Sequence, residues 1–221
     1  MSSTFNWIKE NKKIKIVLLD AGHGGMIDGV YQTKGKRSPV WEDGSQYFEG
    51  VGNRMIRDYL AKMLREAGIR YKYVNEGERD MSLKQRVSII NAYARKYGKN
   101  NCLVISIHSD AFREEQAHGW SVYTSPNQTR SDLFATDLYH TTKGIFYQEK
   151  YRTQGRKDGD PDKEAKFYIL TKTICPAILS ENFFMTNERE CKEILMTKWG
   201  QKNIAKAHFE MIKMNYYETA A

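Results

Sequence analysis

The chain has 221 residues, of which 40% are hydrophobic and 12% aromatic, which predicts one folded domain with a single core. No stretch approaches the roughly 18 consecutive apolar residues of a membrane span. The first residues carry no apolar signal region, so we expect synthesis in the cytoplasm or a leader that has been removed. Lys and Arg total 35 against 27 Asp and Glu, a net charge of +8. This charge favours a polyanionic partner such as nucleic acid, an anionic membrane or an acidic cell-wall polymer, although basic residues spread along the chain also fit an ordinary solvated surface.

Strand and helix patterns alternate along the chain. We expect strands over 14–20, 69–74, 102–108, 120–124, 167–170 and 177–180, and helices over 49–67, 83–97, 131–148, 188–195 and 198–217. This alternation predicts an α/β fold: a single layered domain, phosphorylase/hydrolase-like, with a mostly parallel central sheet flanked by helices. The three cysteines, Cys102, Cys175 and Cys191, match no disulfide framework and no Cys-x-x-Cys metal pair, so we expect buried free thiols.

Three of the predicted strands end at side chains that can bind a metal or carry a proton. The first runs into a glycine-rich segment that contains His23, the third ends at His108, and the last ends at Glu181. In an open α/β sheet, ligands bind just beyond the carboxyl ends of the strands. The sequence therefore predicts one site built from these three residues along one edge of the sheet.

A catalytic zinc ion often takes two histidines and one carboxylate. His23 and His108 are the candidate nitrogen ligands, and Glu49, at the start of the first helix, can fold back to supply the oxygen. An acidic residue in the first turn is also explained by the helix dipole, so that alternative stays open for Glu49. Glu181 then remains to activate a metal-bound water and to protonate the leaving amine, unless it only pairs with a surface lysine.

Other polar residues near these strand ends have supporting roles in this hypothesis. Asp20 and Asp110 are candidates to accept a ring N–H from a ligand histidine, although turn and cap roles fit them equally well. Gly22, Gly24 and Gly25 bracket His23 and allow the backbone to pass close to a metal. The loop and helix positions of three further histidines favour packing or surface roles; these are His118, His140 and His208.

Several motifs follow one another from about residue 14 to about residue 217. They are LLDAGHGG at 18–25, FEGVGN at 48–53, SIHSDA at 106–111 and PAILSENFFMTN at 176–187, with supporting segments at 75–86, 117–119 and 122–123. In this order they resemble the zinc-dependent N-acetylmuramoyl-L-alanine amidases of the Amidase_3 family. Those enzymes cut the amide between the lactyl group of muramic acid and L-alanine in peptidoglycan.

The resemblance implies a peptidoglycan hydrolase with Zn²⁺ held by His23, Glu49 and His108, with Glu181 as the catalytic residue and Asn53 one helical turn after Glu49. It implies an amidase catalytic domain over 14–217, between an N-terminal extension (1–13) and a C-terminal tail (218–221). We expect a monomer that acts on the cell wall, in the periplasm or outside the cell, with peptidoglycan as partner, no nucleic acid and no membrane span. Release of a phage-type endolysin would fit a chain without an export signal.

The sequence departs from the family pattern in places. Gly50 and Gly52 stand where the family has charged or apolar residues, which predicts a looser helix start. If Glu49 does not bind the metal, Glu42, in the preceding loop, is the alternative ligand. Phe183 replaces a glycine two residues after the catalytic glutamate. The loop 25–49 is divergent and is expected to contact glycan or peptide, and the segment 125–166 is too short to hold the inhibitory helix of some members.

Two rival functions remain open. A related zinc peptidase would cut a D-amino-acid bond of the stem peptide with the same residues. A non-catalytic basic module that binds cell wall or nucleic acid would use the positive charge, and its binding would fall steeply with salt. Such a module has no need of the general base Glu181.

Overall fold

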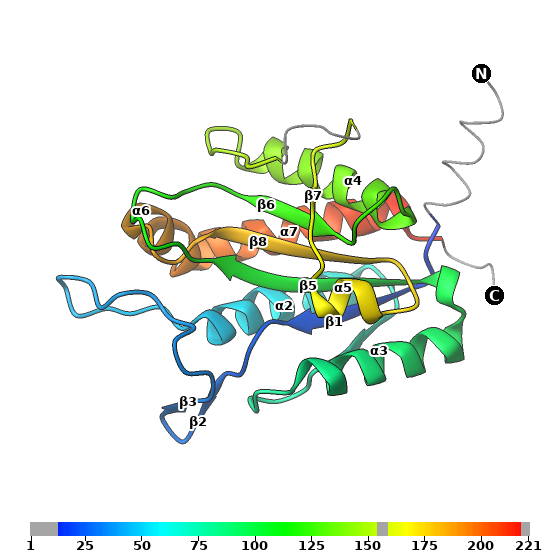
Figure 1. The fold of residues 1–221 in the computed structure, drawn as a ribbon, viewed down its shortest axis with the longest axis horizontal. Helices are drawn as coiled ribbons and strands as arrows, with labels where there is room; N and C mark the ends of the chain where they lie inside the picture. The colour runs from blue at the N-terminus through cyan, green and yellow to red at the C-terminus, as the bar shows by residue number, and fades with distance from the viewer. Residues whose placement is uncertain (1–12, 154–158, 218–221) are drawn as a thin grey trace.

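The computed structural model describes residues 13–153 and 159–217. Within that part of the chain, a six-stranded sheet runs through the middle of the molecule in the order β4-β1-β5-β8-β6-β7 (Figure 1). The strands are β1 (Ile16–Ala21), β4 (Tyr71–Tyr73), β5 (Cys102–Asp110), β6 (Ser121–Thr124), β7 (Lys163–Glu164) and β8 (Ala177–Phe184). A separate antiparallel pair, β2 (Met26–Ile27) and β3 (Val30–Tyr31), extends from the loop after β1.

The centre of the sheet is parallel. β1 pairs in parallel with β4 and β5, and β5 with β8, whereas β6 runs antiparallel to β8. Every residue of β1 is buried, as expected for a parallel strand that is covered on both faces. The expectation of a mostly parallel sheet flanked by helices is confirmed, and the carboxyl ends of β1, β5 and β8 lie together at one edge.

Helices cover both faces of the sheet (Figure 1). One face carries α2 (Glu49–Glu66), α4 (Arg130–Ile145) and α7 (Lys198–Asn215), which pack together over the larger apolar cluster. The other face carries α3 (Leu83–Tyr97) and the short α5 (Tyr168–Lys172) over a smaller cluster. Short helical turns complete the described chain: η1 (Lys99–Asn101), α6 (Glu188–Glu190) and the π-helical η2 (Cys191–Leu195).

Local sequence explains where two of these helices begin. Ser82 caps α3 and forms a reciprocal capping box with Gln85, which satisfies free backbone N–H groups of the first turn. No side chain caps α2; instead, the backbone N–H of Glu49 donates to the carbonyl of Lys36 at 3.0 Å. The loop before α2 therefore fixes the first residue of that helix.

One predicted element has the wrong type. The segment 167–170 was expected to be a strand, but Tyr168–Lys172 forms the helix α5, in which the N–H groups of Leu170 and Thr171 both donate to the carbonyl of Phe167. A four-residue apolar run cannot by itself separate a buried strand from a helical turn. The helix predicted over 83–97 has those bounds, and the one predicted over 188–195 is divided into α6 and η2. The remaining predicted elements are present with shifted ends, for example β4 at Tyr71–Tyr73.

The predicted extension and tail lie, except for residue 13, outside the described residues. The described ends of the domain meet, because Ile14 forms an isolated bridge with Tyr216. Three cysteines, Cys102, Cys175 and Cys191, are buried and free, as expected. Among the described helices, none has the length and apolar character that crossing a bilayer requires.

Candidate metal centre

Two histidines, one just beyond β1 and the other within β5, converge on one buried carboxylate. His23 Nε2 lies 3.2 Å from one oxygen of Glu49, and His108 Nδ1 lies 3.1 Å from the other. Their three ligand atoms all fall within 4.8 Å of one another, and the Glu49 side chain is 2% exposed. Burial alone would raise the pKa of Glu49, but hydrogen bonds to His108 and His23 outweigh it and hold that pKa below its ordinary value.

This donor set fits a catalytic zinc ion. Two imidazoles and one carboxylate form a common three-ligand zinc site that leaves a coordination position for water or substrate. The backbone also leaves room for the rings, since a Cβ at Gly22 would lie 2.3 Å from the His108 ring. The residue before His23 must therefore be glycine if His108 is to reach the site.

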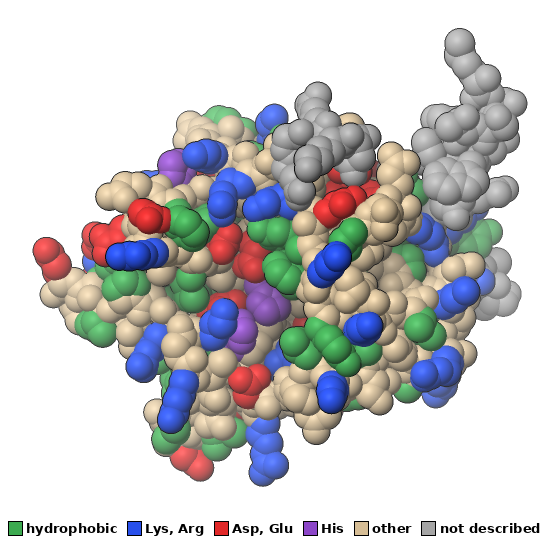
Figure 2. All heavy atoms as spheres, in the orientation of Figure 1, with side chains coloured by type: hydrophobic (Ala, Val, Ile, Leu, Met, Phe, Trp, Pro, Cys, Tyr) green, Lys and Arg blue, Asp and Glu red, His purple; other side chains and the backbone are tan. Residues whose placement is uncertain are grey.

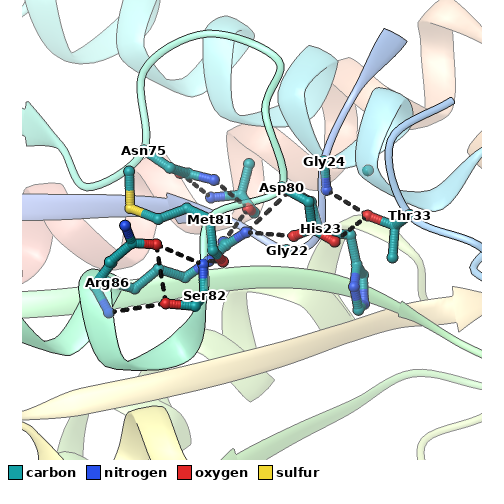
Figure 3. Close-up of polar contacts among 12 residues, drawn as sticks. Gly22, His23, Gly24, Thr33, Asn75, Asp80, Met81, Ser82 and Arg86 are labelled. Atoms are coloured by element: carbon teal, nitrogen blue, oxygen red, sulfur yellow. Dashed lines mark hydrogen bonds and ion pairs between the residues drawn. The ribbon is translucent and has the colours of Figure 1, made fainter. Parts of the chain in front are cut away.

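His23 sits in a turn whose backbone is unfavourable for most residues. Its φ is 65°, in the left-handed region that favours glycine, so the surrounding structure must hold it there. On the outer side of the turn, the N–H of Gly24 donates to Thr33, and the Thr33 hydroxyl donates to Asp80 at 2.6 Å (Figure 3). These contacts fix the chain immediately after His23.

Two buried arginines hold the inner side of the same turn. Arg86 donates to the His23 carbonyl at 3.0 Å (Figure 3). It also donates to the Ala21 carbonyl at 2.6 Å and forms an ion pair with Asp20 at 2.7 Å. Arg54 donates to the same His23 carbonyl and to the carbonyl of Gly50, both at 2.9 Å. Because Arg54 lies on α2, it links the His23 turn to the helix that carries Glu49. We call these two residues the arginine clasp.

His108 is positioned by the sheet itself. It lies within β5, in register with Glu181 of β8, and its carbonyl accepts a hydrogen bond from Asn182 at 2.9 Å. Asn182 also donates to the hydroxyl of Ser180, which lies 3.0 Å from Nε2 of the buried His208. A buried polar chain therefore connects the His108 backbone to helix α7.

The start of α2 is tightly packed rather than loose. A Cβ at Gly50 would lie 1.9 Å from the carbonyl oxygen of Gly24, and one at Gly52 would lie 2.0 Å from the Tyr47 hydroxyl. Gly50 therefore lets the helix approach the His23 loop, and Gly52 leaves room for Tyr47, which corrects the expectation of a looser start. Asn53, one turn on, is buried with its amide 3.4 Å from a Glu49 oxygen.

Glu181 lies beside the metal group in a cavity of about 610 Å³, whose lining includes His23, His108 and Glu181. Figure 2 shows histidine side chains in a hollow of this face, with basic, acidic and hydrophobic groups around it. Oxygen Oε2 of Glu181 is buried and has no hydrogen-bond partner among the described residues. Burial, followed by the negative charges of Glu49 and Asp110, raises the pKa of Glu181 well above its ordinary value.

Phe183 occupies a backbone conformation in β8 that glycine would adopt more easily. Its φ is 64°, the left-handed conformation that glycine adopts without strain, and the β5–β8 register shifts between His108 and Asp110. Phe183 is fully buried and packs on Phe146 with ring centroids 5.1 Å apart. Core packing therefore holds the phenylalanine in a conformation that its own backbone disfavours.

Two of the predicted supporting residues have the structural role that was left open for them, and neither forms a hydrogen bond with a histidine ring of the described residues. The Asp20 oxygens accept hydrogen bonds from Arg86 and Ser106, so Asp20 supports the His23 turn through Arg86 rather than by accepting from a ligand ring. Asp110 pairs with Arg152 at 3.0 Å. The fallback ligand Glu42 is exposed in its loop, outside the cluster.

The other histidines have the packing and surface environments that were expected. His118 contacts the Gln116 carbonyl in a loop, His140 is exposed on α4, and His208 is fully buried. Helix α4, in the segment 125–166, packs on α7 and β6 and contributes no residue to the cavity lining.

Sequence reasoning missed Arg54, Arg86, Asn75 and Asn182. Arg86 was part of a recognised motif but had no assigned role, and Asn75 exchanges two hydrogen bonds with the Ala21 backbone at 3.0 and 2.6 Å. A signal was available for the arginines, since each falls within the buried stripe of its helix, where a charged residue needs partners.

Known proteins resemble this chain over most of its length. An N-acetylmuramoyl-L-alanine amidase of Salmonella typhimurium, AmiA, is 25% identical over 88% of the chain and 74% of its own length. An uncharacterised cell wall amidase of Bacillus anthracis is 26% identical over 97% of the chain and 40% of its own length.

Solved structures share the fold. An N-acetylmuramoyl-L-alanine amidase of Clostridium difficile 630 superimposes with a TM-score of 0.73 at 22% identity, covering 91% of this chain and 96% of that one. The catalytic domain of the CD27L endolysin has a TM-score of 0.62 at 18% identity, over 92% of this chain and 99% of that domain. Residues 17–214 match the Amidase_3 family, described as N-acetylmuramoyl-L-alanine amidase. The chain that places His23, Glu49 and His108 together is thus a member of the Amidase_3 family of peptidoglycan-hydrolysing amidases.

Proposed function

We propose that this site hydrolyses the amide between N-acetylmuramic acid and L-alanine with a zinc ion bound by His23, Glu49 and His108. The observation that carries the proposal is the convergence of these three ligands beside Glu181, which lines the same cavity and has one buried oxygen without a hydrogen-bond partner among the described residues. When bound there, zinc would lower the pKa of a water molecule and polarise the scissile carbonyl.

Glu181 carries the proton transfers in this proposal. A carboxylate with a raised pKa is suited to accept a proton from the attacking water and to give it to the departing alanine nitrogen. The free oxygen Oε2 can accept that proton without breaking a hydrogen bond of the described protein. Glu49, with both oxygens turned to histidines and a lowered pKa, stays ionised and serves as a ligand.

The substitution Glu181→Gln tests this assignment. We expect the variant to keep one zinc per chain by elemental analysis and to lose about 10²- to 10⁴-fold in turnover, the range for a general acid–base residue. Glu42→Gln, which changes an exposed glutamate of the loop, is the matched control and should turn over normally. Hydrolysis by Glu181→Gln at the wild-type rate would exclude the proposed role.

Product identification separates the rival functions. Mass spectrometry of digested muropeptides should reveal new N-terminal L-alanine, whereas a stem peptidase would release termini within the peptide. A binding module would give no product, and its retention on cell wall would fall steeply with salt. We further propose that the enzyme works as a monomer on the cell wall, and light scattering of the purified protein measures that state.

A further inference from the structure

The lining of the cavity beside the metal group includes both apolar and basic side chains. Leu83 and Phe167 lie on its lining and remain 51% and 40% exposed, which gives an apolar wall contributed by the start of α3 and the segment before α5. Lys36, from the loop before α2, also lines the cavity. A substrate in the cavity therefore meets apolar surface and a lysine within the same space.

Lys36 is anchored to the metal-binding helix. Its carbonyl accepts the backbone N–H of Glu49 at 3.0 Å and the hydroxyl of Tyr31 at 2.9 Å. The same Tyr31 hydroxyl accepts the N–H of Gly50 at 2.9 Å. Although Lys36 is an exposed loop residue, its backbone is thus held against the first turn of α2, next to a metal ligand.

The charge of Lys36 is available to a ligand. Lys36 and Lys163 are the cations whose positive charges act on Glu181. The ammonium of Lys163 already lies 2.6 Å from the Tyr123 hydroxyl and 4.6 Å above that ring. Among residues 13–153 and 159–217, Lys36 has no carboxylate within ion-pair distance. Arg86 also lines the cavity but is already paired with Asp20, so Lys36 is the basic residue of this lining that remains available to pair with a substrate.

The stem peptide offers a matching anion. After L-alanine comes a D-glutamyl residue linked through its side-chain carboxyl, so its α-carboxylate is free, one residue beyond the scissile amide, unless it is amidated. We propose that Lys36 binds this α-carboxylate and makes the enzyme prefer stems with free D-glutamate over stems in which that group is a carboxamide. This inference rests on the proposed amidase function and adds a substrate preference to it.

The preference follows from simple electrostatics. A carboxylate forms a charge-assisted contact with an ammonium, whereas a neutral carboxamide does not. Because Lys36 lies at a solvent-exposed edge, the contact is partly screened, and we expect a preference of about tenfold in kcat/KM rather than several hundredfold. A contact remote from the reacting atoms should appear mainly in KM.

Two synthetic muramoyl tripeptides that differ only in this carboxylate or carboxamide test the inference. The wild-type enzyme should cleave the carboxylate substrate about tenfold more efficiently. Lys36→Met should bring the two kcat/KM values to within about twofold of each other, and Lys36→Arg should restore the preference. Lys34→Met is the matched control: it removes an exposed lysine of the same loop that does not line the cavity, and should keep the wild-type preference.

The outcomes distinguish this inference from the proposed function. Equal cleavage of both substrates by the wild type overturns the preference but leaves the amidase function intact. A Lys36→Met variant that slows both substrates equally also overturns it, because Lys36 would then act through Glu181 or the fold. Cleavage of neither substrate by zinc-loaded wild-type enzyme would instead overturn the proposed function, and the preference with it. A salt dependence of KM for the carboxylate substrate alone supports the charge pair.

Discussion

His23 and His108 reach the same carboxylate, but different parts of the structure position them. His108 lies in a regular parallel strand, where the ladder between β5 and its neighbours sets its place. His23 lies just beyond a strand, in a left-handed turn that the arginine clasp and Thr33 hold from two sides. One ligand therefore depends on the sheet, and the other depends on a few long side chains.

This difference predicts where the metal site is vulnerable. The register of a buried sheet is specified by the hydrophobic pattern of whole strands, so losing one side-chain contact changes it little. A strained turn persists only while its surroundings hold it, so losing one arginine should release it. We expect the His23 side of the site to be the more sensitive of the two.

Gly22→Ala should have the largest effect, because Gly22 directly precedes His23 and also packs against the His108 ring. The added methyl group would lie 2.3 Å from the His108 ring and would displace that ring from Glu49. We expect loss of most of the bound zinc and at least about a 100-fold fall in turnover, measured by elemental analysis and hydrolysis assay.

Gly144→Ala is the control for that substitution. Gly144 lies on α4 with nothing within 4 Å of an added Cβ, so alanine should bind zinc normally and raise stability by up to about 1 kcal/mol. Normal zinc content in Gly22→Ala would contradict the close approach of the two motifs.

The second test compares how strongly zinc binding depends on the support of each histidine. Arg86→Lys weakens the support of His23, and Asn182→Ala removes the contact to the His108 carbonyl. Lysine keeps a positive charge for Asp20 but cannot donate to two carbonyls in a fixed geometry. We expect Arg86→Lys to weaken zinc binding by about 10- to 100-fold and Asn182→Ala by less than about 10-fold. Competition with a chelator, on variants shown to be folded by circular dichroism, measures both. Equal losses would mean that the turn and the strand are equally robust.

The smallest expected effect is a pH dependence of folding stability that arises from His208, at the far end of the polar chain that begins at the His108 backbone. Burial lowers the pKa of His208 to about 4, and its Nδ1 donates to the Ile204 carbonyl while Nε2 faces Ser180. The folded protein binds this proton less readily than the unfolded chain, whose histidine pKa is about 6.5. The contribution of neutral His208 to the free energy of unfolding is therefore complete above pH 6.5 and is lost as the pH falls toward 4.

Urea unfolding at several pH values measures this effect. The unfolding midpoint of the wild type should fall more between pH 7 and pH 5 than that of His208→Gln. His140→Gln, at an exposed position of α4, is the control and should follow the wild type. Identical pH dependence in His208→Gln and wild type would show that His208 does not titrate as its burial requires.

Much of the architecture could be predicted because its signals are local. The buried run at 16–19 and the helical period of α2 lie within single segments, and the strand-to-helix alternation then places the carboxyl ends of β1, β5 and β8 at one edge. The strand predicted over 167–170 was wrong, because four residues carry too little periodicity to separate a strand from a helix.

The supporting contacts of the site could not be predicted in the same way. Arg86 reaches the His23 carbonyl across 63 positions, and Arg54 reaches it across 31. No spacing rule connects residues so far apart in the chain. The prediction of a loose start for α2 was wrong for a related reason. Gly50 is required by the backbone of Gly24, which is distant in sequence.

The buried cysteines have a consequence for the environments in which the enzyme can work. Burial raises the pKa of Cys102 and Cys191 to about 11 and that of Cys175 to about 12, so each stays a protonated thiol at neutral pH. Disulfide exchange and oxidation both proceed through the thiolate, which these residues rarely form. The folded domain should therefore keep its three thiols free under reducing and oxidising conditions alike.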